Sequence, residues 1–275
     1  MRYGQCTKYH FSARLLGTEV IVALDDDEVV GPDYLTTALD FVGQEHQGEP
    51  ILGLGGPYLD SSGSKLLPEG PATGNIFLDK SIIMNAGTRD LEAKPDRLVQ
   101  TPVALGGNMV FHRDLFTQVS FDPFITRGED IDYLINAALR GFRFWCDKQL
   151  VITHLPPEAS HGSPAWGKLR QDVLRFIYER EKLHIARTDP SQFDPYPGRF
   201  LREDVDTQAI GALRTLSNAE MEECFGSAEE IVAHALRTAE EKVARYFTFA
   251  REWPTLMTTL GEDVGLRRYL SGRVG

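Results

Sequence analysis

The chain has 275 residues, of which 42% are hydrophobic and 25% are charged, and its formal net charge is −11. This composition is typical of a folded globular protein with a substantial core, organised as one large domain or two small ones. The negative charge argues against a general nucleic-acid or anionic-membrane surface, and it leaves room for a local basic pocket that takes a phosphorylated ligand.

The first predicted strand lies in residues 18–27, TEVIVALDDD, where a short apolar run ends in three carboxylates. The run is rich in β-branched residues, which predicts a strand buried on both faces inside a parallel sheet. Asp25, Asp26 and Asp27 would then lie at the carboxyl end of the strand, where open α/β sheets place ligand sites. Adjacent carboxylates repel one another unless a cation lies between them, so the triplet indicates a divalent-metal site or a solvated acidic turn.

Short elements interrupted by glycine are predicted for the following residues. Apolar residues at helical spacing predict a helix over residues 33–42, and residues 50–59 predict a glycine-broken strand. Residues 99–112 predict two short strands separated by Gly106 and Gly107. Paired glycines in a strand pattern indicate close approach of a backbone or a ligand, and a simple bulge is the alternative.

A second acidic group opens the helix predicted over residues 129–141. Glu129 and Asp130 lie in its first turn, where the helix dipole favours negative charge, so a purely structural role is open to both. Short strands are expected over residues 142–145 and 150–153, and His154 follows the second of them.

The composition changes near residue 160, after which the apolar residues follow helical spacing. The capping-box spacing of Ser217 with Glu220, and of Ser227 with Glu230, predicts two helix starts. A long apolar stripe over residues 232–253 predicts core packing rather than a cofactor site.

The order of these motifs resembles that of the glycosyltransferases of the GT-A fold, in particular the family 2-like group of the nucleotide-diphospho-sugar transferase superfamily. The acidic triplet resembles the DXD motif of that family, and a GGN segment, a GED helix start and an RGF helix end follow it. The matching segments are residues 25–27, 106–109 with 112–116, 128–132 and 140–142.

The resemblance implies an α/β fold with a Rossmann-like mixed sheet flanked by helices. Residues 1–158 would form a partial catalytic domain, and residues 159–275 would form a helical C-terminal region. Members of the family begin with a strand, a helix and a second strand that hold the nucleotide base. Here the DXD-like strand begins close to Met1, so we expect an N-terminally truncated domain.

The family pattern also implies roles for the acidic residues. Asp27 would bind Mg²⁺ or Mn²⁺ directly, and Asp25 would bind the ion through water or hold the ribose of the donor. His154 would complete the metal site, and a structural histidine is the alternative. Asp130 would remove the proton of the acceptor hydroxyl, as in inverting members, and Glu129 would hold the acceptor or the loop.

The remaining site residues are expected to contact the substrates. Asp26 and Arg127 would lie at the donor, where Arg127 contacts the diphosphate; a salt bridge within the protein is the other reading of Arg127. Gly106, Gly107 and Asn108 would let donor sugar and acceptor approach the backbone on the acceptor side.

The expected function is metal-dependent transfer of a sugar from a nucleotide-diphosphate donor to a saccharide, lipid or small-molecule hydroxyl acceptor, with inversion. One alternative is a non-catalytic or partner-dependent truncated member of the family. The other is a sugar-phosphate nucleotidyltransferase, which is disfavoured because no glycine-rich phosphate loop is visible near the N-terminus. The C-terminal helices would shape an acceptor pocket, form a homodimer or contact a membrane surface.

Cysteine usage and hydropathy set the expected compartment. Three widely separated cysteines without a CxxC pair offer neither a disulfide framework nor a zinc site and suit a reducing compartment. There is no signal-peptide pattern and no apolar run of membrane-spanning length. We therefore expect a cytoplasmic protein without a transmembrane segment and without a nucleic-acid partner.

Overall fold

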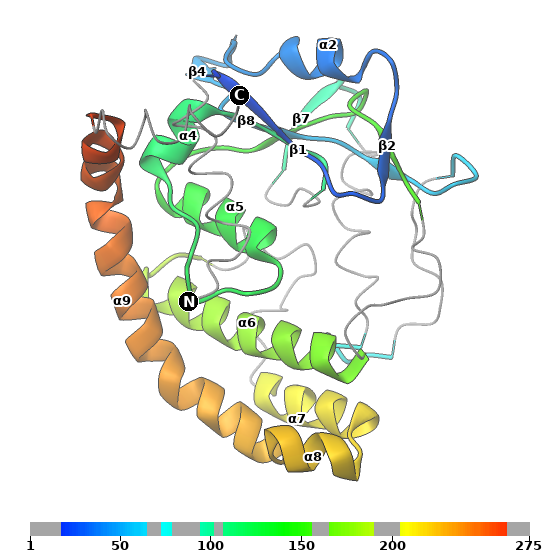
Figure 1. Cartoon of the computed structure of the whole chain (residues 1–275), viewed down its shortest axis with the longest axis vertical. Coiled ribbons are helices and arrows are strands. Elements are labelled where there is room, and N and C mark those ends of the chain that lie inside the picture. The colour runs from blue at the N-terminus through cyan, green and yellow to red at the C-terminus, as the bar shows by residue number, and fades with distance from the viewer. Residues whose placement is uncertain are drawn as a thin grey trace, which may run out of the picture.

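The computed structural model describes residues 18–64, 73–78, 94–101, 107–155, 165–189 and 204–262. In this part of the chain, mixed β-sheets are flanked by helices, and longer helices formed by the C-terminal residues pack beneath them (Figure 1). The predicted α/β class, with a mixed sheet flanked by helices and a helical C-terminal region, is confirmed.

The main sheet has five strands in the order β1-β8-β5-β9-β7. Strands β5 and β9 pair in parallel, whereas the other neighbouring pairs of this sheet are antiparallel. The strands are β1 (Val20–Ala23), β5 (Gly53–Gly55), β7 (Leu98–Gln100), β8 (Met109–His112) and β9 (Trp145–Asp147).

A second sheet of three strands continues from the acidic triplet. Its central strand β10 (Ile152–His154) pairs antiparallel with β2 (Glu28–Val30) and parallel with β6 (Tyr58–Leu59). A two-stranded hairpin joins β3 (Glu45–His46) to β4 (Glu49–Pro50). Strand β2 was not predicted, because it is short and forms only through its pairing with a segment far along the chain.

The prediction for the first strand is wrong in two respects. Strand β1 is antiparallel to β8, and it is an edge strand among the described residues, so it is only half-buried. Its alternating side chains do reach both faces of the sheet: Val20 and Val22 pack on one hydrophobic core, and Ile21 and Ala23 pack on another. A continuous apolar run therefore indicated two covered faces here, and it did not indicate the strand direction.

Helices cover both faces of the main sheet (Figure 1). Helix α2 (Tyr34–Leu39) packs on the side of Val20 and Val22. Helices α4 (Arg113–Gln118) and α5 (Glu129–Leu139) pack on the side of Ala23. The carboxyl end of β1 is thereby brought to the first turn of α5.

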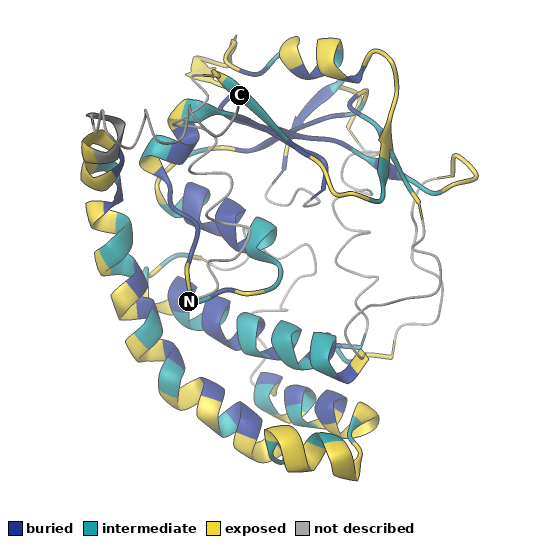
Figure 2. Ribbon diagram, in the orientation of Figure 1, coloured by how far each residue is buried: buried dark blue, intermediate teal, exposed yellow. Residues whose placement is uncertain are grey.

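The C-terminal helices form a further hydrophobic core that also includes Ile135 of α5. Helix α9 runs from the end of α8 up to α4, with its buried residues along its inner side (Figures 1 and 2). At that upper end the indole Nε1 of Trp253 donates a hydrogen bond to the carbonyl oxygen of Phe116 at 2.8 Å. The helices are α6 (Ala165–Ile185), α7 (Val205–Leu216), α8 (Ala219–Phe225) and α9 (Ala228–Glu262).

The two predicted capping boxes have different outcomes. Ser227 and Glu230 exchange hydrogen bonds with each other's backbone N–H, at 3.3 and 2.9 Å, at the start of α9. Helix α8 is instead capped by Asn218, whose side chain accepts a hydrogen bond from the backbone N–H of Met221, so the Ser217 prediction is wrong. No helix in the described ranges is both long and apolar enough to cross a membrane.

Candidate functional site

A cavity of about 310 Å³ opens where β1 ends beside the first turn of α5. It is lined by four of the residues predicted for the site, which are Asp25, Arg127, Glu129 and Asp130. Apolar side chains from β1, from β8 and from the segment after α4, and a glutamine from α6, complete its wall: Ala23, Met109, Phe111, Phe121 and Gln171, together with Thr126 and Gly128. The structure thus brings both predicted acidic groups to one cavity.

The start of α5 is fixed by a glycine in the left-handed region. Gly128 is the residue before the helix, with φ +70°, and a Cβ there would lie 2.8 Å from the guanidinium carbon of Arg175. Glycine is therefore favoured by the backbone conformation, and a side chain there would also have to displace the guanidinium of Arg175. This turn presents Glu129 and Asp130 to the cavity.

A buried ion-pair network holds the next acidic residue of the same helix. The Nζ of Lys182 on α6 lies 2.6 Å from Asp132 Oδ1 and 2.8 Å from Asp122 Oδ2. It also donates to Asn136 Oδ1 at 2.8 Å, and all four residues are buried. The pairing of Asp132 with Lys182 was not predicted, because the two residues are 50 positions apart in the chain and come from different helices.

The carboxylates around the cavity repel one another. Partial burial raises the pKa of Asp25, and the charges of Asp27, Asp130 and Asp26 raise it further. Burial also raises the pKa of Glu129, with further contributions from Asp130 and Asp25. These groups are therefore close enough to interact electrostatically, and a cation among them would relieve the repulsion.

Comparisons with known proteins find no family. No protein-family model and no curated protein matches the chain. Among solved structures, the chain is similar to that of GalNAc-T7 with UDP, GalNAc and Mn²⁺, at 11% sequence identity and a TM-score of 0.44. The similarity covers 92% of this chain and 45% of the GalNAc-T7 chain, so this chain spans less than half the length of GalNAc-T7. A likeness at this distance assigns neither family nor activity.

The predicted metal ligands Asp27 and His154 lie in contact beside the cavity residue Asp25. His154 Nε2 is 3.3 Å from Asp27 Oδ2, and the backbone N–H of Leu155 donates to the carbonyl oxygen of Asp27 at 2.8 Å. Strand pairing creates this contact, because His154 in β10 is opposite Glu28 in β2.

The donor set of this pair fits a divalent ion. Two ligand atoms at adjacent octahedral positions, each about 2.1 Å from the ion, lie roughly 3 Å apart, which is close to the separation of His154 and Asp27. Within the described residues, no group of three or more His, Cys, Asp or Glu side chains is suited to hold a metal. Magnesium is commonly held by one or two carboxylates together with substrate phosphates, and Asp27 could supply one such carboxylate.

Glu28 contacts the cavity residue Asp25 and was not predicted. Its Oε2 accepts a hydrogen bond from the backbone N–H of Asp25 at 2.8 Å, which closes the acidic turn. Burial raises the pKa of Glu28. It is the fourth acidic residue in succession, yet its inward direction follows from the pairing of β2 with β10, which no local pattern encodes.

The predicted acceptor segment has a structural function where it is described. A Cβ at Gly107 would overlap the carboxylate of Glu28, so the close approach indicated by this glycine is made by a side chain of the protein. Asn108 is fully buried; it accepts a hydrogen bond from Tyr34 Oη at 2.7 Å and donates to the carbonyl oxygen of Leu150 at 2.7 Å. Gly106 lies outside the described residues.

Asp26 and Arg127, the other two residues predicted to contact the nucleotide-sugar donor, differ in their surroundings. Asp26 is exposed and follows Asp25 in the turn. Arg127 is partly exposed, and its Nε lies 3.2 Å from Asp172 Oδ1 on α6, as the salt-bridge alternative predicted. It nevertheless lines the cavity, so its guanidinium stands at the edge of the acidic group.

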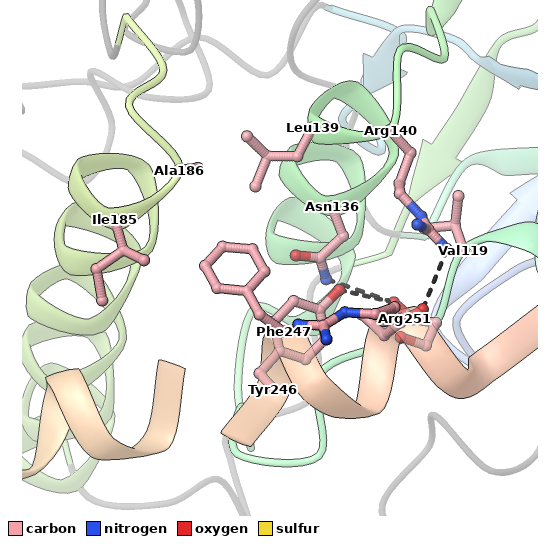
Figure 3. A pocket seen from close by; sticks show the side chains of 11 residues that line it. Val119, Asn136, Leu139, Arg140, Ile185, Ala186, Tyr246, Phe247 and Arg251 are labelled. Carbon is pink, nitrogen blue, oxygen red and sulfur yellow. Dashed lines mark hydrogen bonds between the residues drawn. The ribbon is translucent and has the colours of Figure 1, made fainter. Parts of the chain in front are cut away.

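A second cavity, of about 390 Å³, lies between α5, the end of α6, and α9 (Figure 3). It contains none of the predicted site residues. Its polar groups are used by the framework: Arg140 donates to the carbonyl oxygens of Gln118 and Ala250, and Tyr246 donates to the carbonyl oxygen of Ser120. Leu139, Ile185 and Phe247 make much of the remaining wall apolar (Figure 3). We therefore take the cavity at Asp25 and Asp130 as the candidate site.

Proposed function

We propose that the chain is a metal-dependent glycosyltransferase of the GT-A type that moves a sugar from a nucleotide-diphosphate donor to a hydroxyl acceptor with inversion. The observation that carries this proposal is the meeting of Asp25 with Glu129 and Asp130 at one cavity. The two groups come from different elements, and the motif order of the family pairs the same two segments around its donor and acceptor.

The donor would bind on the side of the acidic turn. Asp27 and His154 would hold Mg²⁺ or Mn²⁺, with Asp25 reaching the ion through water. The ion, when bound, supplies a Lewis acid that stabilises the negative charge of the leaving diphosphate. Arg127, at the edge of the same cavity, would place a further positive charge near those phosphate oxygens.

The acceptor would be activated from the helix side. A sugar hydroxyl is a weak nucleophile until a base removes its proton, and Asp130 lines the cavity without an ion pair among the described residues. Asp130 would accept that proton as the hydroxyl oxygen attacks the anomeric carbon and the diphosphate leaves. Glu129 would hold the acceptor hydroxyls or the loop.

Calorimetric titration with UDP and with GDP, each with and without Mn²⁺, tests the donor side. We expect metal-dependent binding that Asp27→Ala removes and that the control Asp33→Ala retains. Asp33 is exposed, and its side chain makes no capping hydrogen bond to α2, so its replacement removes one negative charge without touching the site. A well-folded chain that binds neither nucleotide would contradict the proposal.

Transfer assays with Asp130→Asn test the acceptor side. Loss of a general base lowers the rate by about 10²–10⁴-fold, while nucleotide binding with Mn²⁺ should stay at the wild-type level. Transfer that continues at the wild-type rate in this variant would show that Asp130 is not the base.

A further inference from the structure

A basic groove of about 220 Å³ adjoins the candidate site on the side of the C-terminal helices. It is bounded by the loop before α5, by α6 and by α9. In a chain whose net charge is −11, no acidic side chain is among the described residues that line this groove. The basic residues that line it are Arg127, Arg170, Arg175, His234 and Lys242.

Of the four arginine and lysine side chains that line the groove, two are already paired and two are not. Arg127 is paired with Asp172, and Arg175 lies 3.2 Å from Glu179 Oε1. Arg170 and Lys242 have no carboxylate within ion-pair distance among the described residues. The guanidinium carbon of Arg170 lies 5.0 Å from the centre of the Phe225 ring.

The groove also contains hydrogen-bond donors that lack acceptors. The Nε atoms of Arg170 and Arg175 are buried and have no hydrogen-bond partner. A buried donor without a partner is unfavourable, and burial lowers the pKa of Arg170. An anion with several acceptor oxygens would balance the unpaired charge of Arg170 and Lys242 at the wall of the groove, as a phosphate group does with arginine.

The position of the groove distinguishes the two substrates of the proposed reaction. Thr126, Arg127 and Gln171 line both the groove and the candidate cavity, so a ligand in one can extend into the other. The expected metal ligands, Asp27 and His154, lie next to β2 and in β10. Strand β2 is on the opposite side of the molecule from α9 (Figure 1). The groove is therefore reached from the side of Asp130, where the acceptor is expected.

We propose that this groove binds the phosphate group of a phosphorylated hydroxyl acceptor. The proposal rests on the proposed function, because it takes Asp130 as the group that meets the acceptor hydroxyl. Lys242 and Arg170 supply the charge that the phosphate neutralises. The bound phosphate directs the hydroxyl end of the acceptor past Thr126 and Gln171, which line both spaces, toward Asp130, while Arg127 contacts the donor.

Titration calorimetry of the full chain with inorganic phosphate, glycerol 3-phosphate and glycerol tests the groove. We expect both phosphates to bind and glycerol not to bind. Lys242→Gln should weaken the binding of glycerol 3-phosphate by about tenfold, which is typical of a lost charge-assisted hydrogen bond. Arg237→Gln is the matched control, since this exposed arginine on the same helix lies outside the groove and should leave binding unchanged.

Arg170→Gln gives a second, independent loss of binding. Because Arg170 stacks on Phe225, its replacement can also loosen α8, so unfolding of each variant is measured beside binding. Lys242 makes no ion pair among the described residues, and Lys242→Gln should therefore unfold at the wild-type temperature. Absence of phosphate binding by the folded wild type, or equal binding by Lys242→Gln, would overturn the proposal.

Titration of Lys242→Gln with UDP and Mn²⁺ separates the acceptor from the donor. We expect wild-type affinity for UDP. If UDP binding falls as far as the binding of glycerol 3-phosphate, the groove serves the donor diphosphate and the acceptor assignment is wrong. If the wild type binds glycerol 3-phosphate through Lys242 and binds no nucleotide, the phosphate site stands and the proposed function fails.

Discussion

Asp130 and Asp132 are two residues apart on α5, and their surroundings are opposite. Asp132 is fully buried, with Lys182 Nζ at 2.6 Å and Asn136 Nδ2 at 2.8 Å. Asp130 lines the candidate cavity together with Asp25. Helix α5 therefore carries one carboxylate, Asp132, that is buried and paired within the protein, and another, Asp130, that lines a cavity.

The difference shows how the same residue type can fix a structure at one position and offer chemistry at the next. A buried charge must be paired, so Lys182 and Asp132 fix how α6 lies against α5. That contact also sets the direction of the first turn, and with it the position of Asp130. Asp130 thus depends on the buried Asp132 for its position and contributes little to the stability of the fold.

The largest expected effect comes from removing the shared cation. Lys182→Met would leave Asp122 and Asp132 buried without a counter-charge, and breaking a buried pair in this way costs about 3–5 kcal/mol. Urea denaturation measures the free energy of unfolding. The control is Arg180→Met on the same helix, whose partly exposed pair with Asp206 should contribute less than about 1 kcal/mol. An equal loss of unfolding free energy in Lys182→Met and Arg180→Met would show that the buried ion pair contributes no more to stability than the partly exposed one.

The pH dependence of stability is the next effect. Burial raises the pKa of Asp132 from 3.8 to about 7, and the charges of Asp122 and Glu179 add to the shift. The folded chain thus binds a proton at Asp132 in a pH range where the unfolded chain does not. The stability that this proton contributes is complete below pH 3.8 and is lost as the pH rises to about 7.

Asp132→Asn isolates that contribution. The free energy of unfolding of the wild type, taken relative to this variant, should fall between about pH 4 and about pH 7 and then level off, by an amount on the order of a few kcal/mol. Denaturation at a series of pH values measures it. A difference between the two proteins that does not change with pH would show that Asp132 has an ordinary pKa.

A smaller effect is expected at the glycine that opens α5. Gly128 and Gly141 both have positive φ, at +70° and +86°, at opposite ends of the helix. Alanine at either position costs roughly 1–2 kcal/mol for the backbone alone. Only Gly128→Ala also displaces Arg175, since nothing lies within 4 Å of a Cβ at Gly141. We therefore expect Gly128→Ala to lower the free energy of unfolding by roughly 1 kcal/mol more than Gly141→Ala does, and to have a lower midpoint in urea denaturation. Identical midpoints would show that Arg175 moves aside freely.

The sequence predicted this helix well because the evidence for it is local. Apolar residues at helical spacing gave α5 from Glu129 and its end near Gly141, and the glycine-broken segments gave the short strands β5 to β8. The motif order also predicted that Asp25 and Asp130 belong to one site, and the structure brings them to one cavity.

What could not be predicted depends on partners that are distant in the chain. The direction of β1 is set by β8, and the place of Glu28 is set by the pairing of β2 with β10. The burial of Asp132 requires Lys182 from α6. Nothing in GEDID separates the third acidic residue from the first two, because only the packed helix pair distinguishes them.

The smallest expected change in stability is that of Asp130→Asn, and it sharpens the comparison most. Asp130 has no ion pair among the described residues and is only half-buried, so its replacement should change the free energy of unfolding by less than about 0.5 kcal/mol. The same replacement at Asp132 alters a fully buried group that contacts Lys182 and should change the free energy of unfolding severalfold more. If the two variants unfold at the same denaturant concentration, the carboxylate at the cavity is as firmly built into the fold as the buried one. A side chain engaged to that degree has no freedom to accept a proton from a substrate, and the base of the proposed transfer would have to be sought at Glu129.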